Sequence, residues 1–257
     1  MTDLVDRRLV LGGGLALGAA LAAAPALAQS GVGDASVAAT ARLKARPGTP
    51  TQPPLTPGLH VLGLDRARDA YISVPNGIAP GQAVPLIVMF HGKGQPANEV
   101  LGEWKRVAAR RKCLVLAPSA RDFTWNVEQG PGGADAQFVD RALQAVFDRF
   151  TVDPKHIAAS GFSDGGTYAL SLGLVNGNFF SDILAFSPIN YTAPNAVGQP
   201  RIYFCNGNRD QGAVFTNTTS MARQLRADGY DVELYEFNGG HWMDEDGVKK
   251  AMARFMG

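Results

Sequence analysis

The chain has 257 residues, and its 24 Lys and Arg nearly balance its 23 Asp and Glu, so the formal net charge is +1. Hydrophobic residues make up 46% and charged residues 18%, which is typical of a globular protein with a substantial core rather than a disordered one. The balance leaves no basic excess for nucleic acid, and no basic amphipathic stretch indicates a membrane surface, so an uncharged or weakly charged substrate fits better.

The N-terminal segment has the pattern of an export signal. The Arg7-Arg8 pair precedes an apolar run that ends in an Ala-Leu-Ala sequence at Ala28. This order predicts a cleaved signal peptide over residues 1–28, similar to a twin-arginine signal. A retained membrane anchor is the alternative, because the run is close to the length that spans a bilayer. Cleavage would give a periplasmic or secreted protein with no stable membrane association.

Residues 29–58 are rich in Pro, Ala and Thr and predict a linker or an extended arm. Eight short β-rich runs follow, at 59–64, 70–74, 85–90, 113–117, 156–160, 183–187, 201–206 and 232–236. Helical patterns alternate with the later runs, at about 97–111, 134–150, 164–176, 214–229 and 247–256.

This alternation predicts a mostly parallel sheet with helices on both faces. The first two runs are expected to be antiparallel, because only a brief charged turn separates them. Eight strands in this order predict an α/β-hydrolase fold over residues 59–257. The connection from Ser187 to Arg201 is short, so no large cap domain is expected above the sheet.

The only two cysteines, Cys113 and Cys205, fall in strands that this fold places far apart in the sheet. A disulfide needs Cα atoms within about 7 Å, whereas neighbouring strands already lie ~4.8 Å apart. We therefore expect two buried, unpaired thiols.

The strongest motif is the segment 161–166, with sequence Gly-Phe-Ser-Asp-Gly-Gly, directly after an apolar strand and before a helical run. A G-x-S-x-G sequence in this setting predicts a sharp turn that raises the hydroxyl of Ser163 above the sheet as a nucleophile. The helix N-terminus behind it favours the negative charge that develops in acyl transfer. The alternative is a chance Gly-rich turn between a strand and a helix.

A serine nucleophile needs a base and an acid downstream in this fold. His241 is the only histidine after Ser163, and it lies in a Gly-rich loop between the last strand and the last helix. Among the acidic residues between them, Asp210 alone follows the carboxyl end of a strand, where functional loops gather. A surface histidine and a turn-capping aspartate without a catalytic role remain alternatives.

Two backbone N–H groups must stabilise the oxyanion. One is expected from Asp164, the residue after the nucleophile, and the other from the Gly-rich loop after the third strand, where Lys93 is favoured and Gly92 or Gly94 are alternatives. His91 is expected to brace this loop rather than to act as a base.

Together these motifs resemble the exported esterases grouped with polyhydroxybutyrate depolymerases and feruloyl esterases, and the related phospholipase/carboxylesterase group. The similarity covers roughly residues 80–256 and rests on five segments: 91–95, 135–139, 152–157, 206–210 and 239–242. It implies hydrolysis of a carboxylic ester, but it does not choose between a polyester, an aryl ester of the plant cell wall and a small acyl ester. Asp164 and Asn206 depart from the usual residues of these families.

The sequence thus predicts a serine hydrolase that acts on a small-molecule or polymer ester through an acyl-enzyme, without cofactor or metal. Aromatic residues on the expected active-site loops are candidates for substrate binding, in the first place Trp125, Tyr191 and Trp242. A serine peptidase, a thioesterase and a binding protein without turnover remain alternatives. The sequence does not indicate an oligomeric state.

Overall fold

The computed structural model describes residues 40–127, 130–212 and 214–257. The predicted signal peptide and residues 29–39 of the arm lie outside these ranges. Within them, no helix combines the length and the apolar character needed to cross a membrane.

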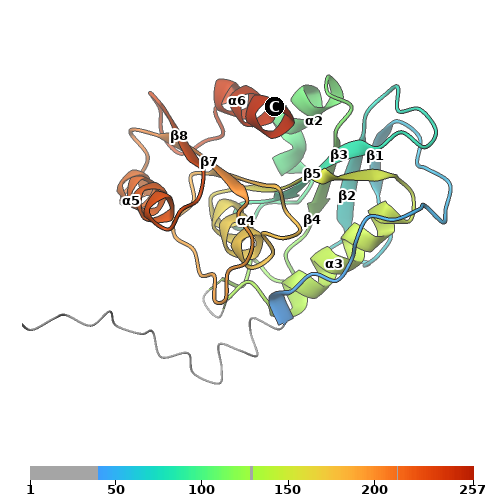
Figure 1. Ribbon diagram of the computed structural model, residues 1–257, viewed down its shortest axis with the longest axis horizontal. Helices are drawn as coiled ribbons and strands as arrows, with labels where there is room; N and C mark the ends of the chain where they lie inside the picture. Colours follow the sequence, from blue (N-terminus) through green and yellow to red (C-terminus); the bar gives the residue numbers. More distant parts are fainter. Residues whose placement is uncertain (1–39, 128–129, 213) are drawn as a thin grey trace, which may run out of the picture. The chain divides into compact units, whose positions relative to one another are not determined.

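A single eight-stranded sheet forms the centre of the described part (Figure 1). Its strands lie in the order β1-β2-β4-β3-β5-β6-β7-β8. β1 pairs antiparallel with β2, β2 pairs antiparallel with β4, and every other pairing is parallel. This confirms the predicted mostly parallel sheet. The strands are β1 (Gly58–Val61), β2 (Ala70–Val74), β3 (Val84–Phe90), β4 (Leu114–Pro118), β5 (Val152–Phe162), β6 (Asp182–Phe186), β7 (Arg201–Gly207) and β8 (Val232–Phe237).

Helices cover both faces of the sheet. The apolar sides of α2 (Gly102–Ala109) and α6 (Glu245–Met256) pack with β3, β4 and β7 in one cluster. On the opposite face, α3 (Gly133–Phe147), α4 (Asp164–Val175) and α5 (Val214–Ala227) cover the strands. β3, β4, β6 and β7 are buried on both faces, and this explains their continuous apolar runs. The fold is the predicted α/β-hydrolase fold.

Ser187 to Pro200 connect β6 to β7 without a helix or a strand of their own. No cap domain is therefore inserted at this point, as the short connection predicted. The helical pattern at 97–111 forms two pieces: a 3₁₀ helix, η1 (Glu99–Leu101), and α2. The two pieces meet at Gly102. Glycine has a low helix propensity, and this favours a break at that position.

The two thiols lie where the sequence predicted. Cys205 belongs to β7, Cys113 directly precedes β4, and three strands lie between β4 and β7 in the sheet. Both cysteines are buried and unpaired, and burial raises the pKa of both thiols.

The described part of the arm lies along α3 rather than away from the domain (Figure 1). Ala41, Leu43 and Ala45 are buried and belong to the same apolar cluster as α3 and α4. Asn176, at the end of α4, accepts a hydrogen bond from the N–H of Leu43 at 2.9 Å and donates one to the carbonyl of Ala41 at 2.9 Å. From Ala41 onward the arm is thus part of the packed structure.

Candidate active site

The turn between β5 and α4 places Ser163 at the carboxyl edge of the sheet. Ser163 has φ 56° and ψ −121°, a strained conformation for a residue with a side chain. Its N–H donates to the carbonyl of Phe186 in β6 at 2.9 Å. A Cβ at Gly161 would lie 2.1 Å from the carbonyl oxygen of Gly165, and one at Gly165 would lie 2.1 Å from that of Phe90. Only glycine fits at either position, so the chain can pass this closely beneath the serine.

The structure brings Ser163, His241 and Asp210 together from the loops after β5, β8 and β7. His241 Nε2 lies 2.9 Å from Ser163 Oγ, and its Nδ1 lies 2.9 and 3.0 Å from the two carboxylate oxygens of Asp210. The side chain of Asp210 is fully buried, whereas that of His241 is 29% exposed. Because carboxylate oxygens accept, Nδ1 carries a proton, and Nε2 is then free to accept the proton of the serine hydroxyl.

Asp210 is held by donors that the sequence did not single out. The Asn206 side-chain amide donates to its Oδ2 at 3.1 Å, and the Gln211 N–H donates to its Oδ1 at 2.7 Å. Asn206 Oδ1 in turn accepts from the hydroxyl of Thr218 in α5 at 2.9 Å, and both side chains are fully buried. Asn206 drew attention only as a departure from a family pattern, and no motif marks Thr218.

In the loop after β3, one of the three candidate backbone N–H groups has no hydrogen-bond partner within the described part of the chain and is available to an anion. The N–H of Gly92 donates to Gln95 Oε1 at 3.0 Å, and that of Gly94 donates to the carbonyl of Phe123 at 2.9 Å. Among the described residues, the N–H groups of Lys93 and Asp164 have no such partner. Of the three amides considered in this loop, only that of Lys93 therefore remains available together with that of Asp164.

His91 is buried beneath this loop and links it to the segment that follows β4. Its Nδ1 donates to the Gly92 carbonyl at 2.8 Å, and its Nε2 accepts from the N–H of Ala120 at 3.0 Å. The bond that Nε2 accepts requires a neutral imidazole, and burial lowers the pKa of His91, which favours the same neutral form. The residue braces the loop, as its position suggested.

Asp164 turns its carboxylate toward a neighbouring loop. The hydroxyl of Thr124 donates to Asp164 Oδ2 at 2.6 Å. Both side chains line a hollow of about 720 Å³, called here the Asp164 hollow. Its other lining residues are Lys93, Arg121, Asp122, Phe123, Trp125, Asn126, Val127, Ala134, Asp135, Thr167, Ile189 and Asn190.

The three predicted substrate-binding aromatics lie in different environments. Trp242 is 50% exposed beside His241, and its ring packs on Phe237 at 5.4 Å between centroids. Tyr191 is half-buried, packs against the cluster between α4 and α5, and does not line the Asp164 hollow.

Trp125 differs from the expectation, because only 2% of it is exposed. Its ring stacks on Tyr168 at 4.6 Å between centroids, and its indole N–H donates to the His91 carbonyl at 2.8 Å. Phe123, 60% exposed at the rim of the hollow, presents the aromatic surface instead. Phe162, which no motif singled out as an aromatic contact, lies 4.8 Å from the His241 ring between centroids.

Within the described ranges, no group of three or more His, Cys, Asp or Glu side chains could hold a metal ion. A hydroxyl bonded to an imidazole that a buried carboxylate orients, next to two free amides, is the arrangement used for acyl transfer.

Two curated relatives are esterases. The chain is 27% identical over 171 residues to the bifunctional acetylxylan esterase/xylanase XynS20E of Neocallimastix patriciarum, covering 62% of this chain and 24% of that protein. It is 24% identical over 143 residues to the probable feruloyl esterase C of Aspergillus terreus, covering 53% of this chain and 51% of that protein. The chain thus matches about a quarter and about half of the lengths of these two relatives.

Solved structures share the fold. The Staphylococcus aureus serine hydrolase FphF superposes with a TM-score of 0.64 at 13% identity, over 79% of this chain and all of that one. A ferulic acid esterase from Anaeromyces mucronatus superposes with a TM-score of 0.57 at 15% identity, over 72% of this chain and 82% of that one. The family model described as "Putative esterase" matches residues 63–245, which is most of the chain. The chain therefore belongs to this esterase family and has the α/β-hydrolase fold.

Proposed function

We propose that the chain hydrolyses carboxylic esters with Ser163 as nucleophile, His241 as general base and Asp210 as the acid that orients the imidazole. His241 takes the hydroxyl proton while the serine oxygen attacks the ester carbonyl, and a tetrahedral oxyanion forms. Its collapse releases the alcohol, which takes the proton from the imidazolium. Water, activated by the same histidine, then attacks the acyl-enzyme and releases the acid.

The oxyanion is assigned to the amides of Lys93 and Asp164. These N–H groups belong to the two loops that flank Ser163, and their hydrogen-bonding capacity is unused in the described structure. The Asp164 amide also lies in the first turn of α4, where the helix dipole favours negative charge. One such donor contributes about 10²–10³ in kcat in serine hydrolases.

The observation that carries this proposal is the 2.9 Å distance between Ser163 Oγ and His241 Nε2, with Asp210 on the other side of the ring. A nucleophile, a base and an orienting acid in one line are needed to make a serine hydroxyl reactive at neutral pH. A binding protein without turnover would gain nothing from this buried arrangement.

The proposed substrate is a short acyl or aryl ester of a hydroxyl-rich alcohol. The relatives named above act on acetylxylan and feruloyl esters by their names, and the Asp164 hollow is lined largely by polar side chains around one exposed aromatic ring. Polar walls offer hydrogen bonds to sugar hydroxyls, and Phe123 offers a face for an aryl group.

The proposed place of action is outside the cytoplasm. This part of the proposal rests on the sequence of residues 1–28, with its arginine pair, apolar run and small residues before the expected cleavage site. N-terminal sequencing of protein recovered from the periplasm and the medium would test it, and a chain that keeps these residues in the cytoplasm would contradict it.

The decisive experiment is the hydrolysis of p-nitrophenyl esters from acetate to octanoate, together with methyl ferulate and acetylated xylan. We expect turnover in the parent protein and a loss of about 10⁴-fold or more in Ser163→Ala. Ser220→Ala is the matched control, because Ser220 is exposed on α5 and is not one of the residues of the site. It should retain the parental rate.

A fluorophosphonate probe reports the same serine without a substrate. Labelling of the parent and Ser220→Ala, but not of Ser163→Ala, is the expected result. No turnover of any ester together with no labelling would overturn the proposal. Labelling with faster cleavage of amides or thioesters than of matched oxygen esters would replace the esterase with a peptidase or a thioesterase.

A further inference from the structure

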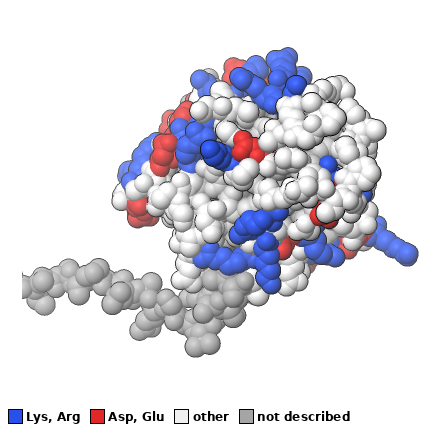
Figure 2. Space-filling view, turned by 45° about the vertical axis from the view of Figure 1, so that its right-hand side comes forward, with Lys and Arg blue, Asp and Glu red and all other residues white. Residues whose placement is uncertain are grey.

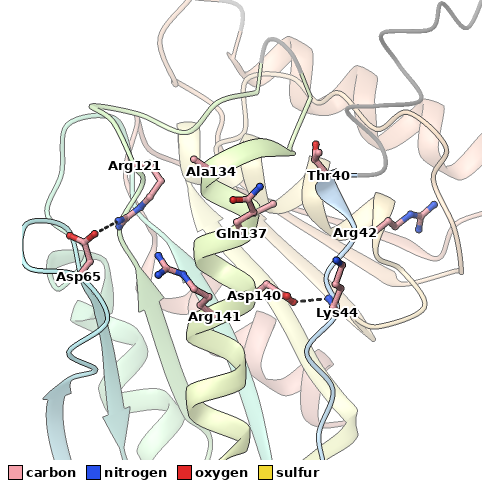
Figure 3. A pocket seen from close by; sticks show the side chains of 10 residues that line it. Thr40, Arg42, Lys44, Asp65, Arg121, Ala134, Gln137, Asp140 and Arg141 are labelled. Atoms are coloured by element: carbon pink, nitrogen blue, oxygen red, sulfur yellow. Dashed lines mark hydrogen bonds and ion pairs between the residues drawn. The ribbon is translucent and has the colours of Figure 1, made fainter.

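A second hollow lies along α3, lined on one side by the arm and on the other by Asp65 and Arg121, and most of its charged side chains are cationic. We call it the basic groove; its volume is about 740 Å³. Figure 3 shows Arg121 and Arg141 on one side of α3, and Lys44 and Arg42 on the arm at the other side. Figure 2 shows Lys and Arg side chains gathered on the lower part of one face of the molecule. Two acidic residues, Asp65 and Asp140, also line the basic groove.

The acidic side chains of the groove do not neutralise its four cations. Asp140 Oδ1 accepts the backbone N–H groups of Lys44 and Ala45 at 2.7 and 2.8 Å, so this carboxylate holds the arm (Figure 3). Asp65 Oδ2 lies 3.3 Å from Arg121 Nη1. Among the described residues, neither the Lys44 ammonium nor the Arg141 guanidinium has a carboxylate within ion-pair distance. Lys44 and Arg141 therefore line this hollow without a direct ion pair, and four cations face two carboxylates.

Arg121 joins the basic groove to the Asp164 hollow. It lines both of them, as Ala134 also does. Its guanidinium lies over the Phe138 ring, 3.5 Å from the centroid, and donates to the Ser119 carbonyl at 2.9 Å. These contacts fix the Arg121 side chain at the boundary between the two hollows. A ligand that extends from Ser163 past Arg121 would therefore meet the cations of the arm and of α3.

We infer that the basic groove is a subsite for carboxylate groups carried by an extended ester substrate, beyond the Asp164 hollow as counted from the ester that Ser163 cleaves. The guanidinium of Arg141 matches a carboxylate with two parallel hydrogen bonds, and the ammonium of Lys44 adds a point charge. The net charge of +1 conceals this local excess. The inference rests on the proposed function and adds to it the chemical class of the polymer: an acidic polysaccharide.

The test is equilibrium binding, which requires no turnover. Tetragalacturonate is the acidic probe and xylotetraose the neutral probe of equal length, each titrated by calorimetry into the Ser163→Ala protein. We expect tetragalacturonate to bind more tightly, and raised salt to weaken it while leaving xylotetraose nearly unchanged. Because this salt comparison uses the unaltered groove, it decides the matter even where a groove variant fails to fold.

A variant then locates the binding. Adding Lys44→Gln and Arg141→Gln should weaken tetragalacturonate binding by about tenfold, the effect of losing two partly solvated ion pairs. The matched control adds Lys105→Gln and Arg111→Gln, which remove one lysine and one arginine exposed on or just after α2, on the opposite face of the sheet. The control should bind as the parent does.

The inference is overturned if tetragalacturonate binds no better than xylotetraose, or if both double variants weaken its binding equally. Failure of the proposed function looks different. A parent protein that binds the acidic probe in the groove yet neither cleaves esters nor reacts with a fluorophosphonate would retain the subsite and lose the esterase.

Discussion

At the scale of single residues, Asp164 is the most informative feature of the site. It supplies one expected oxyanion amide through its backbone, while its own carboxylate lies in the adjoining hollow, bonded to Thr124 at 2.6 Å. A fixed negative charge a few ångströms from a developing oxyanion raises the energy of the transition state. The bond to Thr124 directs that charge toward the wall of the hollow.

Replacing Asp164 with Asn should therefore increase kcat/KM for a neutral ester such as p-nitrophenyl acetate. Removal of one partly solvated like charge corresponds to about a threefold to tenfold gain. Thr124→Val is the control, because it removes the hydrogen bond and keeps the charge, so it should bring no gain. A fall in kcat/KM for Asp164→Asn would show that the carboxylate assists the reaction, for example by binding the alcohol.

At the scale of elements, the sequence predicted the strands and helices well for a physical reason. Strands buried on both faces consist of short continuous apolar runs, whereas surface helices repeat their apolar residues about every 3.6 positions. The two patterns are therefore easy to separate. β5 is longer than its predicted run 156–160 and begins at Val152. The added residues include Asp153, Pro154 and Lys155, which do not have the apolar pattern of a buried strand.

The candidate site also has a part that the sequence could predict and a part that it could not. Ser163, His241 and Asp210 could be placed from the sequence because each must follow the carboxyl end of a particular strand. The direction of a loop side chain could not, since it depends on partners distant in sequence. Trp125 faces inward because its ring stacks on Tyr168 and its indole N–H donates to the His91 carbonyl. Nothing near Trp125 in the sequence indicates these two partners.

Asn176 is one of the groups that attach the arm to the domain, beside Asp140 and the apolar contacts of Leu43. Asn176 alone forms hydrogen bonds to the Leu43 N–H and the Ala41 carbonyl, as well as to the carbonyl of Leu172 in α4. Asn176→Ala would leave buried backbone groups without partners and should lower the free energy of unfolding by about 2 kcal/mol. We also expect faster trypsin cleavage after Lys44, because a loosened backbone fits the active site of a protease more readily. Urea unfolding and limited proteolysis measure the two effects.

Asn178→Ala provides the comparison for that experiment. Asn178 lies two residues further along the chain and is exposed, so its loss should change neither the unfolding free energy nor the cleavage rate. Equal sensitivity of the two variants to trypsin would contradict the assigned role of Asn176.

At the scale of the whole molecule, stability should depend on pH through His91. Burial lowers the pKa of this residue in the folded protein, whereas in the unfolded chain it is about 6.5. Below that value the unfolded chain binds a proton that the folded chain excludes. His91 therefore contributes stability that is present above about pH 6.5 and is lost as the pH falls, by at most about 1.4 kcal/mol per unit.

Urea unfolding at about pH 7.5 and about pH 5.5 measures this dependence. His91→Gln keeps a hydrogen-bonding side chain without a titrating group, so its stability should fall less between the two pH values than that of the parent. The difference between the two proteins isolates His91 from the other titrating groups. Equal pH slopes would show that His91 is not the group responsible.

The two buried thiols have a consequence for where the chain can mature. The sheet keeps Cys113 and Cys205 apart and inaccessible, so no covalent cross-link has to form before the native state is reached. The fold is consequently indifferent to the redox potential of its surroundings: it can be completed among the reduced thiols of a cytoplasm and retained unchanged in an oxidising medium. A chain of this kind does not depend on disulfide-forming enzymes in its host.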